Sequence, residues 1–287
     1  MNLENFNMNI GIYTNKSKDV GGIWSAKLHS LLTRSGIGYV DIPDGNYSVL
    51  NPVDENFAQK IDLIVVLGGD GTILGLTTYA AKNNIPVIGI NAGKLGFLTE
   101  FETFEMESAV ALIKENKLKT DERILLMIDV NGETFYALND CVFQRIYDEE
   151  SSGSLIASLS VSLDGTLVDQ ITGDGVIVST PTGSTAYSLS AGGPILAPGI
   201  DSFCITSISA HSLHHRPIIY DSRSDCEICV EESGGAVGLF CDGKLVKKLA
   251  KNDFVRICKA PHTVTFLRKK DSNFYKRLLL KLNSGRN

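Results

Sequence analysis

A largely apolar run from Ile61 to Leu67 leads directly into the sequence Gly68-Gly69-Asp70-Gly71-Thr72. A short run of this kind is typical of a strand that is buried on both faces of a parallel sheet. In open α/β sheets, ligands bind beyond the carboxyl ends of the strands, where loop amides and the next helix N-terminus can receive a phosphate. The order strand, glycine loop, helix therefore predicts an α/β domain with a phosphate-binding loop.

Asp70 is the one charged residue of this loop. Glycine allows a positive φ and lets a phosphate approach without a Cβ in the way. A carboxylate in the same place repels a phosphate unless it holds a metal ion or accepts a proton from an attacking hydroxyl. The alternative interpretation is a surface turn in which Asp70 caps a helix that starts near Thr72.

The first part of the chain alternates between strand-like and helix-like segments. We expect strands at 9–13, 39–42, 61–67 and 85–90, and helices at 24–35, 72–82 and 104–116, the first of them ended by Gly36. Such alternation predicts a mostly parallel sheet with right-handed crossovers. Residues 1–122 are therefore interpreted as an α/β domain, Rossmann-like in its alternation and phosphofructokinase-like in its Gly-Gly-Asp loop.

The second part of the chain has short β-rich runs separated by turn dipeptides. Asn131-Gly132, Asp164-Gly165 and Asp242-Gly243 each lie between strand-like segments, which indicates hairpins. Residues 123–270 are therefore predicted to form a β-rich domain. Residues 271–287 carry a helical apolar stripe that we expect to pack back on the α/β domain, formed by Phe274, Tyr275, Leu278, Leu279 and Leu282.

Charge and composition exclude several kinds of partner. The formal net charge of −6 argues against a general nucleic-acid or anionic-membrane surface, which needs clustered Lys and Arg. The chain shows neither a signal-peptide pattern nor the roughly 20 apolar residues of a membrane span. The six cysteines are scattered through strand-like runs, which suits a reducing compartment. We therefore expect a cytoplasmic protein with no nucleic-acid or membrane partner.

The sequence assigns no metal to protein side chains. Cys226 and Cys229 have CxxC spacing, but their surroundings alternate like a strand, which directs the two thiols to opposite faces. The histidines at 211, 214 and 215 are interpreted as loop residues.

Two familiar nucleotide-binding motifs are also missing. Gly238 to Lys244 fits a Walker loop except that Leu245 replaces the Ser/Thr that would bind magnesium. No G-x-G-x-x-G motif follows the first strand, which disfavours hydride transfer.

Two further segments carry groups suited to a nucleotide. Residues 173–194 are rich in hydroxyls that can bind ribose, phosphate or amide groups, and Tyr187 offers a flat face for a base. The pair Asn139-Asp140 ends a strand and can bind the two hydroxyls of a ribose. The alternatives are a Ser/Thr-rich turn with helix caps for the first segment and a simple turn or cap for the second.

Taken together, the Gly-Gly-Asp-Gly-Thr loop, the Asn139-Asp140 pair and the Thr-Pro-Thr-Gly-Ser-Thr-Ala-Tyr segment at 180–187 resemble the NAD kinase family. The resemblance extends to the segments 89–98, 214–217 and 242–243. It implies phosphorylation of the 2′-hydroxyl of the adenosine ribose of NAD by ATP, giving NADP. It also implies a two-domain fold, a divalent cation such as Mg²⁺, and a homodimer or homotetramer.

The resemblance assigns roles to individual residues. Asp70 matches the catalytic proton acceptor, and Gly68, Gly69, Gly71 and Thr72 match the ATP and phosphate loop. The NAD contacts implied are Asp70, Gly71, Phe97, Asn139, Asp140, Asp174, Thr182, Thr185, Ala186, Tyr187, Ser188, Leu189 and Ser190. Three positions depart from the family pattern, since Asp140 replaces a frequent Glu, Thr172 a frequent Arg, and Lys244 a frequent Gln.

Other functions remain open from the sequence. Lipid kinases of the diacylglycerol type and sugar-phosphate kinases also place a Gly-Gly-Asp loop after a strand, but they do not account for the segment 182–187. A non-catalytic dinucleotide sensor would bind NAD without turnover, and the presence of Asp70 argues against it. The sequence does not separate NAD from NADH as acceptor, or ATP from polyphosphate as donor.

Overall fold

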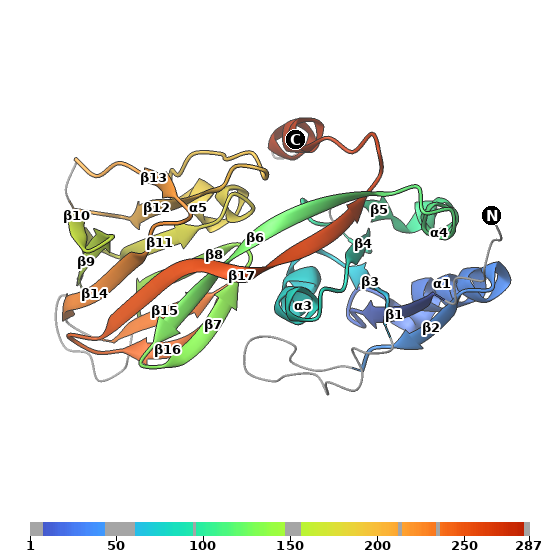
Figure 1. Ribbon diagram of the computed structural model, residues 1–287, viewed down its shortest axis with the longest axis horizontal. Coiled ribbons are helices and arrows are strands. Elements are labelled where there is room, and N and C mark those ends of the chain that lie inside the picture. Colours follow the sequence, from blue (N-terminus) through green and yellow to red (C-terminus); the bar gives the residue numbers. More distant parts are fainter. Residues whose placement is uncertain are drawn as a thin grey trace. The chain divides into compact units, whose positions relative to one another are not determined.

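The computed structural model describes residues 8–43, 61–93, 96–146, 156–211, 214–233 and 236–283 (Figure 1). The chain forms two compact units, which divide between Glu122 and Arg123 and again between His262 and Thr263. Two long strands carry the chain from one unit to the other, β6 (Lys119–Val130) and β17 (Phe254–Arg268). The sequence analysis placed the second boundary between the units after residue 270, whereas the structure places it inside β17. This strand is continuous, and its first part belongs to the second unit and its last part to the first.

The first unit is built on a parallel sheet. Its strands lie in the order β2-β1-β3-β4, with β5 and the end of β17 also paired in parallel with β4. The strands are β1 (Asn9–Thr14), β2 (Gly38–Asp41), β3 (Leu63–Gly68), β4 (Val87–Asn91) and β5 (Phe101–Glu102). Every residue of β3 and β4 is buried, which confirms the prediction of an α/β domain with a parallel sheet.

Helices cover both faces of this sheet. On one face, α1 (Ile23–Ser35) and α4 (Met106–Lys114) bury Leu28, Leu32, Met106 and Val110 against β1 and β3. The other face receives α3 (Asp70–Lys82), and a Cβ at Gly89 of β4 would lie 2.5 Å from Ile73 Cδ1. As predicted, α1 ends at Gly36, whose φ of +70° is left-handed. Since Gly69 is the N-cap, α3 begins two residues earlier than predicted.

The second unit consists of antiparallel strands in two groups. One group has the order β10-β9-β14-β17, with β6 pairing both β17 and β7, and the other has the order β13-β12-β11-β8-β15-β16. Their bounds are β7 (Glu133–Ala137), β8 (Asp140–Arg145), β9 (Ala157–Leu163), β10 (Thr166–Gly173), β11 (Gly175–Ser179), β12 (Ser202–Ile208), β13 (Ile218–Asp221), β14 (Cys226–Ser233), β15 (Val237–Cys241) and β16 (Lys244–Leu249). This confirms the predicted β-rich domain.

The three predicted hairpin turns are present. Asn131, Asp164 and Asp242 have φ values of +53°, +48° and +47°, and the glycine after each has a φ of +82°, +76° and +78°. Two successive positive φ values define the type I′ turn that matches the twist of the flanking strands. These turns join β6 to β7, β9 to β10 and β15 to β16.

All six cysteines are free thiols. Cys226 and Cys229 both lie on β14 as free thiols, the first buried and the second half-buried. In the described ranges, no helix is long and apolar enough to span a membrane.

The last helix, α6 (Phe274–Asn283), joins the first unit through a different face from the one predicted. Phe274, Arg277, Leu278 and Lys281 are half-buried, and Phe274 packs against Phe97 with ring centroids 6.3 Å apart. The expectation that the whole apolar stripe is buried is wrong, because the helix is turned to bring Arg277 to backbone carbonyls. Three members of the stripe, Tyr275, Leu279 and Leu282, are 64%, 62% and 51% exposed.

A buried ion network ties β17 and α6 to the first unit. The Arg268 guanidinium donates to Glu100 Oε2 at 3.2 Å and to Asp121 Oδ2 at 3.1 Å, and Arg277 donates to Glu100 Oε2 at 2.7 Å. The Arg268 and Glu100 side chains are only 4% and 2% exposed. A charge buried in this way is strongly destabilising once its partner is removed.

We expect Arg268→Met to lower the free energy of unfolding of the first unit by about 3–5 kcal/mol, because Glu100 and Asp121 lose a buried partner. Urea unfolding measures this loss. Arg256→Met is the matched control, since Arg256 pairs with Asp225 at the exposed surface, and we expect it to change stability little. Equal effects of the two substitutions would contradict this interpretation of the network.

Candidate functional site

Asp70 is the first residue of α3, and its carboxylate binds a neighbouring loop. Asp70 Oδ2 accepts the N–H of Phe97 at 2.7 Å, and Oδ1 accepts the N–H of Leu98 at 3.1 Å. Gly96 makes this approach possible, because a Cβ there would collide with the Asp70 carboxylate. The carboxylate is therefore held by a loop and does not cap its own helix, whose N-cap is Gly69.

The loop that holds Asp70 is itself fixed from its other side. Arg277 Nη1 donates to the carbonyls of Phe97 at 2.8 Å and Thr99 at 2.5 Å. Arg268 Nη1 donates to the carbonyl of Leu98 at 2.7 Å. The amides of this segment thus bind Asp70 and its carbonyls bind two arginines, so the carboxylate has a fixed position. No local sequence pattern pointed to these arginines, because each is separated from the carbonyl that it binds by 170 to 180 residues in the sequence.

A lysine that the sequence interpretation missed lies against the glycine loop. A Cβ at Gly69 would lie 2.5 Å from Lys18 Nζ, and one at Gly93 would lie 3.4 Å from it. Lys18 belongs to the loop after β1, which neighbours β3 in the sheet. Asn15 on the same loop donates from Nδ2 to Thr72 Oγ1 at 2.9 Å. The loop after β1 therefore brings an ammonium group to the helix N-terminus where a phosphate would bind.

In the second unit, the half-buried acid Asp242 holds the Asn139-Asp140 pair. The Asp242 carboxylate accepts the backbone N–H groups of Leu138 at 2.9 Å, Asn139 at 2.7 Å and Asp140 at 3.3 Å. Asp242 is also the first residue of the turn between β15 and β16, as its sequence predicted. Its second role, fixing the backbone of the pair, was not visible in the sequence because the two segments are about 100 residues apart.

The hydroxyl-rich segment packs directly against this pair. The N–H of Thr180 donates to the Asn139 carbonyl at 2.9 Å, and Thr180 Oγ1 donates to the Leu138 carbonyl at 2.5 Å. Gly183 is required here because a Cβ would collide with the backbone of Asn139. The second unit therefore brings together the two segments that the sequence singled out separately.

The side chains of the hydroxyl-rich segment divide into two groups. Ser184 Oγ accepts the N–H of Leu196 at 2.9 Å, Ser188 Oγ bonds Thr206 Oγ1 at 3.0 Å, and Thr182 Oγ1 accepts from Arg123 at 3.1 Å. These three hydroxyls and that of Thr180 are buried and hold the loop. The accessible members are Thr185, Ala186, Tyr187, Leu189 and Ser190, with Tyr187 37% exposed. The buried hydroxyls therefore stabilise the loop itself, and nucleotide binding by the accessible members stays a prediction.

The remaining predicted residues lie near the same strands. Asp174, at the start of β11, forms an ion pair with Arg145 at 2.8 Å. Thr172 and Lys244, two of the departures from the family pattern, have exposed side chains. His215 contacts Asp169 at 3.0 Å. Across the described part of the chain, no group of three or more His, Cys, Asp or Glu side chains is arranged to hold a metal ion.

Two neighbouring acids give the second unit an unusual electrostatic feature. Burial and then the nearby Asp242 charge raise the pKa of Asp140 to about 7. Burial also raises the pKa of Asp242, to about 6, although its three backbone N–H donors act in the opposite direction. Desolvation disfavours the charged form of a carboxyl, so both groups bind protons more tightly in the folded state than in the unfolded chain.

This shift predicts a pH-dependent stability. Between pH 4 and pH 7 the folded state holds a proton on Asp140 that the unfolded chain releases, so the contribution of this group to stability falls as pH rises. Asp140→Asn removes the titration. We therefore expect the stability of the variant relative to wild type to increase from pH 4 to pH 7, measured by urea unfolding. A difference that is constant over this range would contradict the raised pKa.

Comparison with known proteins extends these observations. The family models of the ATP-NAD kinase N-terminal domain and C-terminal domain match residues 10–117 and 144–269. NAD kinase of Clostridium botulinum is 35% identical over 282 residues, with 96% of each chain covered. NAD kinase of Chloroherpeton thalassium is 37% identical over 236 residues, with 81% of each covered.

Two solved structures share the fold. Yeast NADH kinase complexed with NADH has a TM-score of 0.82 and 26% identity, with 96% of this chain and 88% of that chain covered. An NAD kinase from Archaeoglobus fulgidus in complex with ATP has a TM-score of 0.77 and 23% identity, with 96% of this chain and 99% of that chain covered.

Proposed function

Because this chain belongs to the NAD kinase family, we propose that it transfers the γ-phosphoryl group of ATP to the 2′-hydroxyl of the adenosine ribose of NAD, giving NADP. The observation that carries the proposal is the Asp70 carboxylate, fixed by two amides beside a glycine loop at the N-terminus of α3. Phosphoryl transfer needs mainly positioning and charge neutralisation, and the fixed carboxylate supports the positioning.

In the proposed mechanism Asp70 is the proton acceptor. The ribose 2′-oxygen attacks the γ-phosphorus, the bond from that phosphorus to the β,γ-bridging oxygen breaks, and ADP leaves. The proton of the 2′-hydroxyl passes to the Asp70 carboxylate. Each carboxylate oxygen accepts one backbone hydrogen bond and has a further lone pair for this proton.

The triphosphate is proposed to bind at the glycine loop formed by Gly68, Gly69, Gly71 and Thr72. The first-turn amides of α3 and the Lys18 ammonium supply positive charge at this loop. A divalent cation, for which Mg²⁺ is the simplest choice, would enter with the ATP phosphates and neutralise their charge. Magnesium commonly binds one or two carboxylates together with substrate phosphates and water, and Asp70 is the acid of this loop.

NAD is proposed to bind the second unit through the Asn139-Asp140 pair and the segment that packs on it. The accessible residues Thr185, Ala186, Tyr187, Leu189 and Ser190 offer a stacking face and hydrogen-bonding groups. Thr182 and Ser188 would contribute by holding this segment in shape, because their hydroxyls are bonded internally. Asp174 and Phe97 complete the proposed contacts.

We also propose that the protein is cytoplasmic and forms a homodimer or homotetramer. Light scattering measures the molar mass of the assembly and so separates the two oligomeric states.

The direct test incubates the pure protein with NAD, ATP and Mg²⁺ and detects the product with an NADP-specific dehydrogenase. Parallel reactions with NADH as acceptor and polyphosphate as donor settle the two choices that the sequence leaves open. Folded protein that binds NAD and yields no NADP would be a dinucleotide sensor and would refute the proposed activity.

Asp70→Asn should lower kcat by roughly 10²- to 10⁴-fold, because general-base assistance is lost, with NAD affinity largely kept. Asparagine keeps one acceptor oxygen for the loop amides. The control is Asp62→Asn, the same chemical change at the amino end of β3, where the Asp62 carboxylate accepts the N–H of Asn9. Thermal unfolding checks that both variants fold. Near-normal turnover of Asp70→Asn would remove Asp70 from the mechanism.

Lys18→Met should raise the KM for ATP by roughly 10- to 100-fold and leave the KM for NAD nearly unchanged, because only the donor phosphates lose a charge-assisted hydrogen bond. Lys27→Met removes one positive charge from α1 of the same unit and is the matched control. If both variants shift the KM for ATP equally, the effect is a general electrostatic one and Lys18 has no direct contact.

A further inference from the structure

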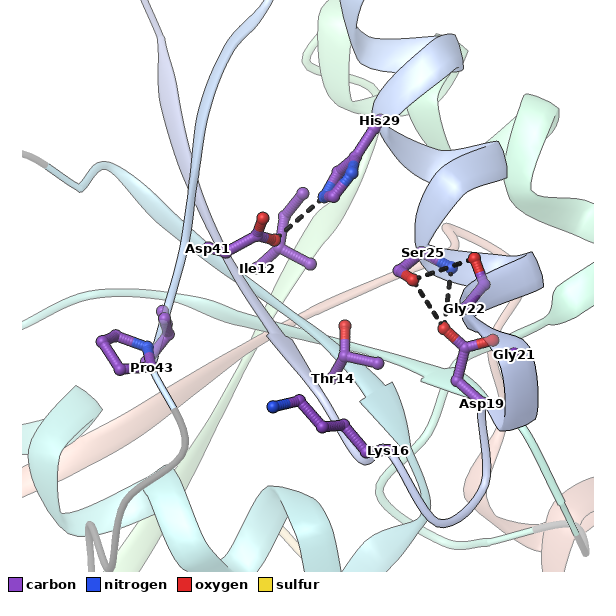
Figure 2. Close-up of a pocket in the computed structure, with 11 residues that line it drawn as sticks. Ile12, Thr14, Lys16, Asp19, Gly21, Gly22, Ser25, His29, Asp41 and Pro43 are labelled. Carbon is purple, nitrogen blue, oxygen red and sulfur yellow. Dashed lines mark hydrogen bonds and ion pairs between the residues drawn. The ribbon is translucent and has the colours of Figure 1, made fainter.

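The first unit contains a cavity of about 500 Å³ that the proposed roles do not use (Figure 2). It lies at the carboxyl ends of β1 and β2, and its size falls within the range of small-molecule sites. The walls come from β1, the loop that follows it, the start of α1 and the end of β2.

The position of Asp41 in this cavity suggests what it could bind. In dinucleotide-binding α/β folds, an acid at the end of the second strand, about 20 residues beyond the glycine turn, accepts hydrogen bonds from ribose hydroxyls. Gly21 and Gly22 have φ values of +78° and +68° and open α1, and Asp41 ends β2 at that same spacing. The chain thus has the ribose-binding half of this arrangement although it lacks the G-x-G-x-x-G motif.

Asp41 is oriented for this role by its neighbours. Its Oδ1 contacts His29 Nε2 at 2.9 Å, and the His29 ring stacks on Tyr39 with ring centroids 4.7 Å apart. The Asp41 side chain remains 62% exposed. Figure 2 shows His29 and Asp41 together on one side of the cavity and Asp19 with Ser25 on the other.

The start of α1 offers no site for a phosphate, because Asp19 is bonded to its amides. The Asp19 carboxylate accepts the N–H groups of Trp24 at 2.8 Å and Ser25 at 3.0 Å, and the Ser25 hydroxyl at 2.7 Å. These bonds outweigh the effect of burial and lower the pKa of Asp19, so it is ionised at neutral pH. An internal anion therefore already occupies the N-terminus of α1, where a dinucleotide fold would bind pyrophosphate.

The phosphates of such a ligand have a separate place in the same unit. Thr14, Lys16 and Asp19 line the cavity, and Lys18, between them in the chain, reaches Gly69 of the glycine loop. β1 lies between β2 and β3 in the sheet, so the cavity and the glycine loop flank the same loop after β1. Pro43 is exposed and supplies apolar surface for a base, whereas Ile12 and Ile42 also line the cavity but are only 1% and 5% exposed.

We propose that this cavity binds the ribonucleoside end of the phosphoryl donor, with the ribose hydroxyls donating hydrogen bonds to the Asp41 carboxylate. The inference rests on the proposed kinase function and adds where the donor's nucleoside lies. It makes Asp41 a determinant of donor specificity, because a donor without ribose hydroxyls loses this contact.

The test pairs a variant with a modified donor. Asp41→Asn should raise the KM for ATP by roughly tenfold, the effect of losing a hydrogen bond to a charged group. For 2′,3′-dideoxy-ATP, which lacks the hydroxyls, wild type should show a similarly raised KM and Asp41→Asn should add nothing further. The KM for NAD should stay unchanged in both proteins. Asp62→Asn serves again as the control.

Calorimetric titration of ATP and 2′,3′-dideoxy-ATP into both proteins makes the same comparison without turnover. Wild-type protein that binds ATP with this hydroxyl dependence but makes no NADP would refute the proposed function and leave the cavity assignment standing. A preference for ATP over the dideoxy analogue that persists in Asp41→Asn would overturn the assignment, as would an unchanged affinity for ATP or a selective rise in the KM for NAD.

Discussion

The proposed catalytic centre of the first unit depends on one interaction, the Asp70 carboxylate bonded to the amides of Phe97 and Leu98. Without these bonds, the side chain of this first residue of α3 would have no fixed orientation. The amides can hold it because Arg268 and Arg277 bind the carbonyls of the same segment. Glu100 pairs with both arginines, and Asp121 also pairs with Arg268. The position of one reactive group is thus fixed by residues near the end of the chain, through hydrogen bonds that are charge-assisted on both sides.

The second unit solves a similar positioning problem at an electrostatic cost. Asp242 gives three backbone amides an acceptor and so fixes Asn139 and Asp140, but it places a second acid beside Asp140 in a region with little solvent. Hydrophobic packing alone could not hold these backbone N–H groups, because buried donors need acceptors. The raised pKa of Asp140 is therefore a consequence of the structure that positions it. A cationic or hydroxyl-bearing ligand at Asp140 would relieve part of that cost.

The sequence predicted those features that local patterns encode. Alternating strands and helices, the end of α1 at Gly36 and the three type I′ turns all follow from neighbouring residues. Three contacts could not be predicted, because each joins segments far apart in the chain. They are the approach of Lys18 to Gly69, the hydrogen bond from Arg277 to the Phe97 carbonyl, and the hydrogen bond from the Leu138 N–H to Asp242. The α6 stripe was predicted from periodicity alone, yet the arginine on a neighbouring face of the helix decided which side it buries. The number of hydroxyl side chains in the segment 180–190 likewise does not tell which of them are buried in hydrogen bonds within the protein and which remain accessible to a ligand.

The loop after β1 shows why a missing motif is weak evidence against a binding site. The chain lacks G-x-G-x-x-G after β1, and the amides of Trp24 and Ser25 at the start of α1 are bonded to the Asp19 carboxylate. The same strand, turn, helix and strand still place Asp41 at the edge of a cavity. Moving the phosphate site from α1 to α3 requires only that a cation and a glycine loop lie on the other side of β1, which Lys18 and Gly69 provide. In our proposal the nucleoside therefore binds in the cavity and the phosphates bind at the glycine loop, on two sides of the loop after β1.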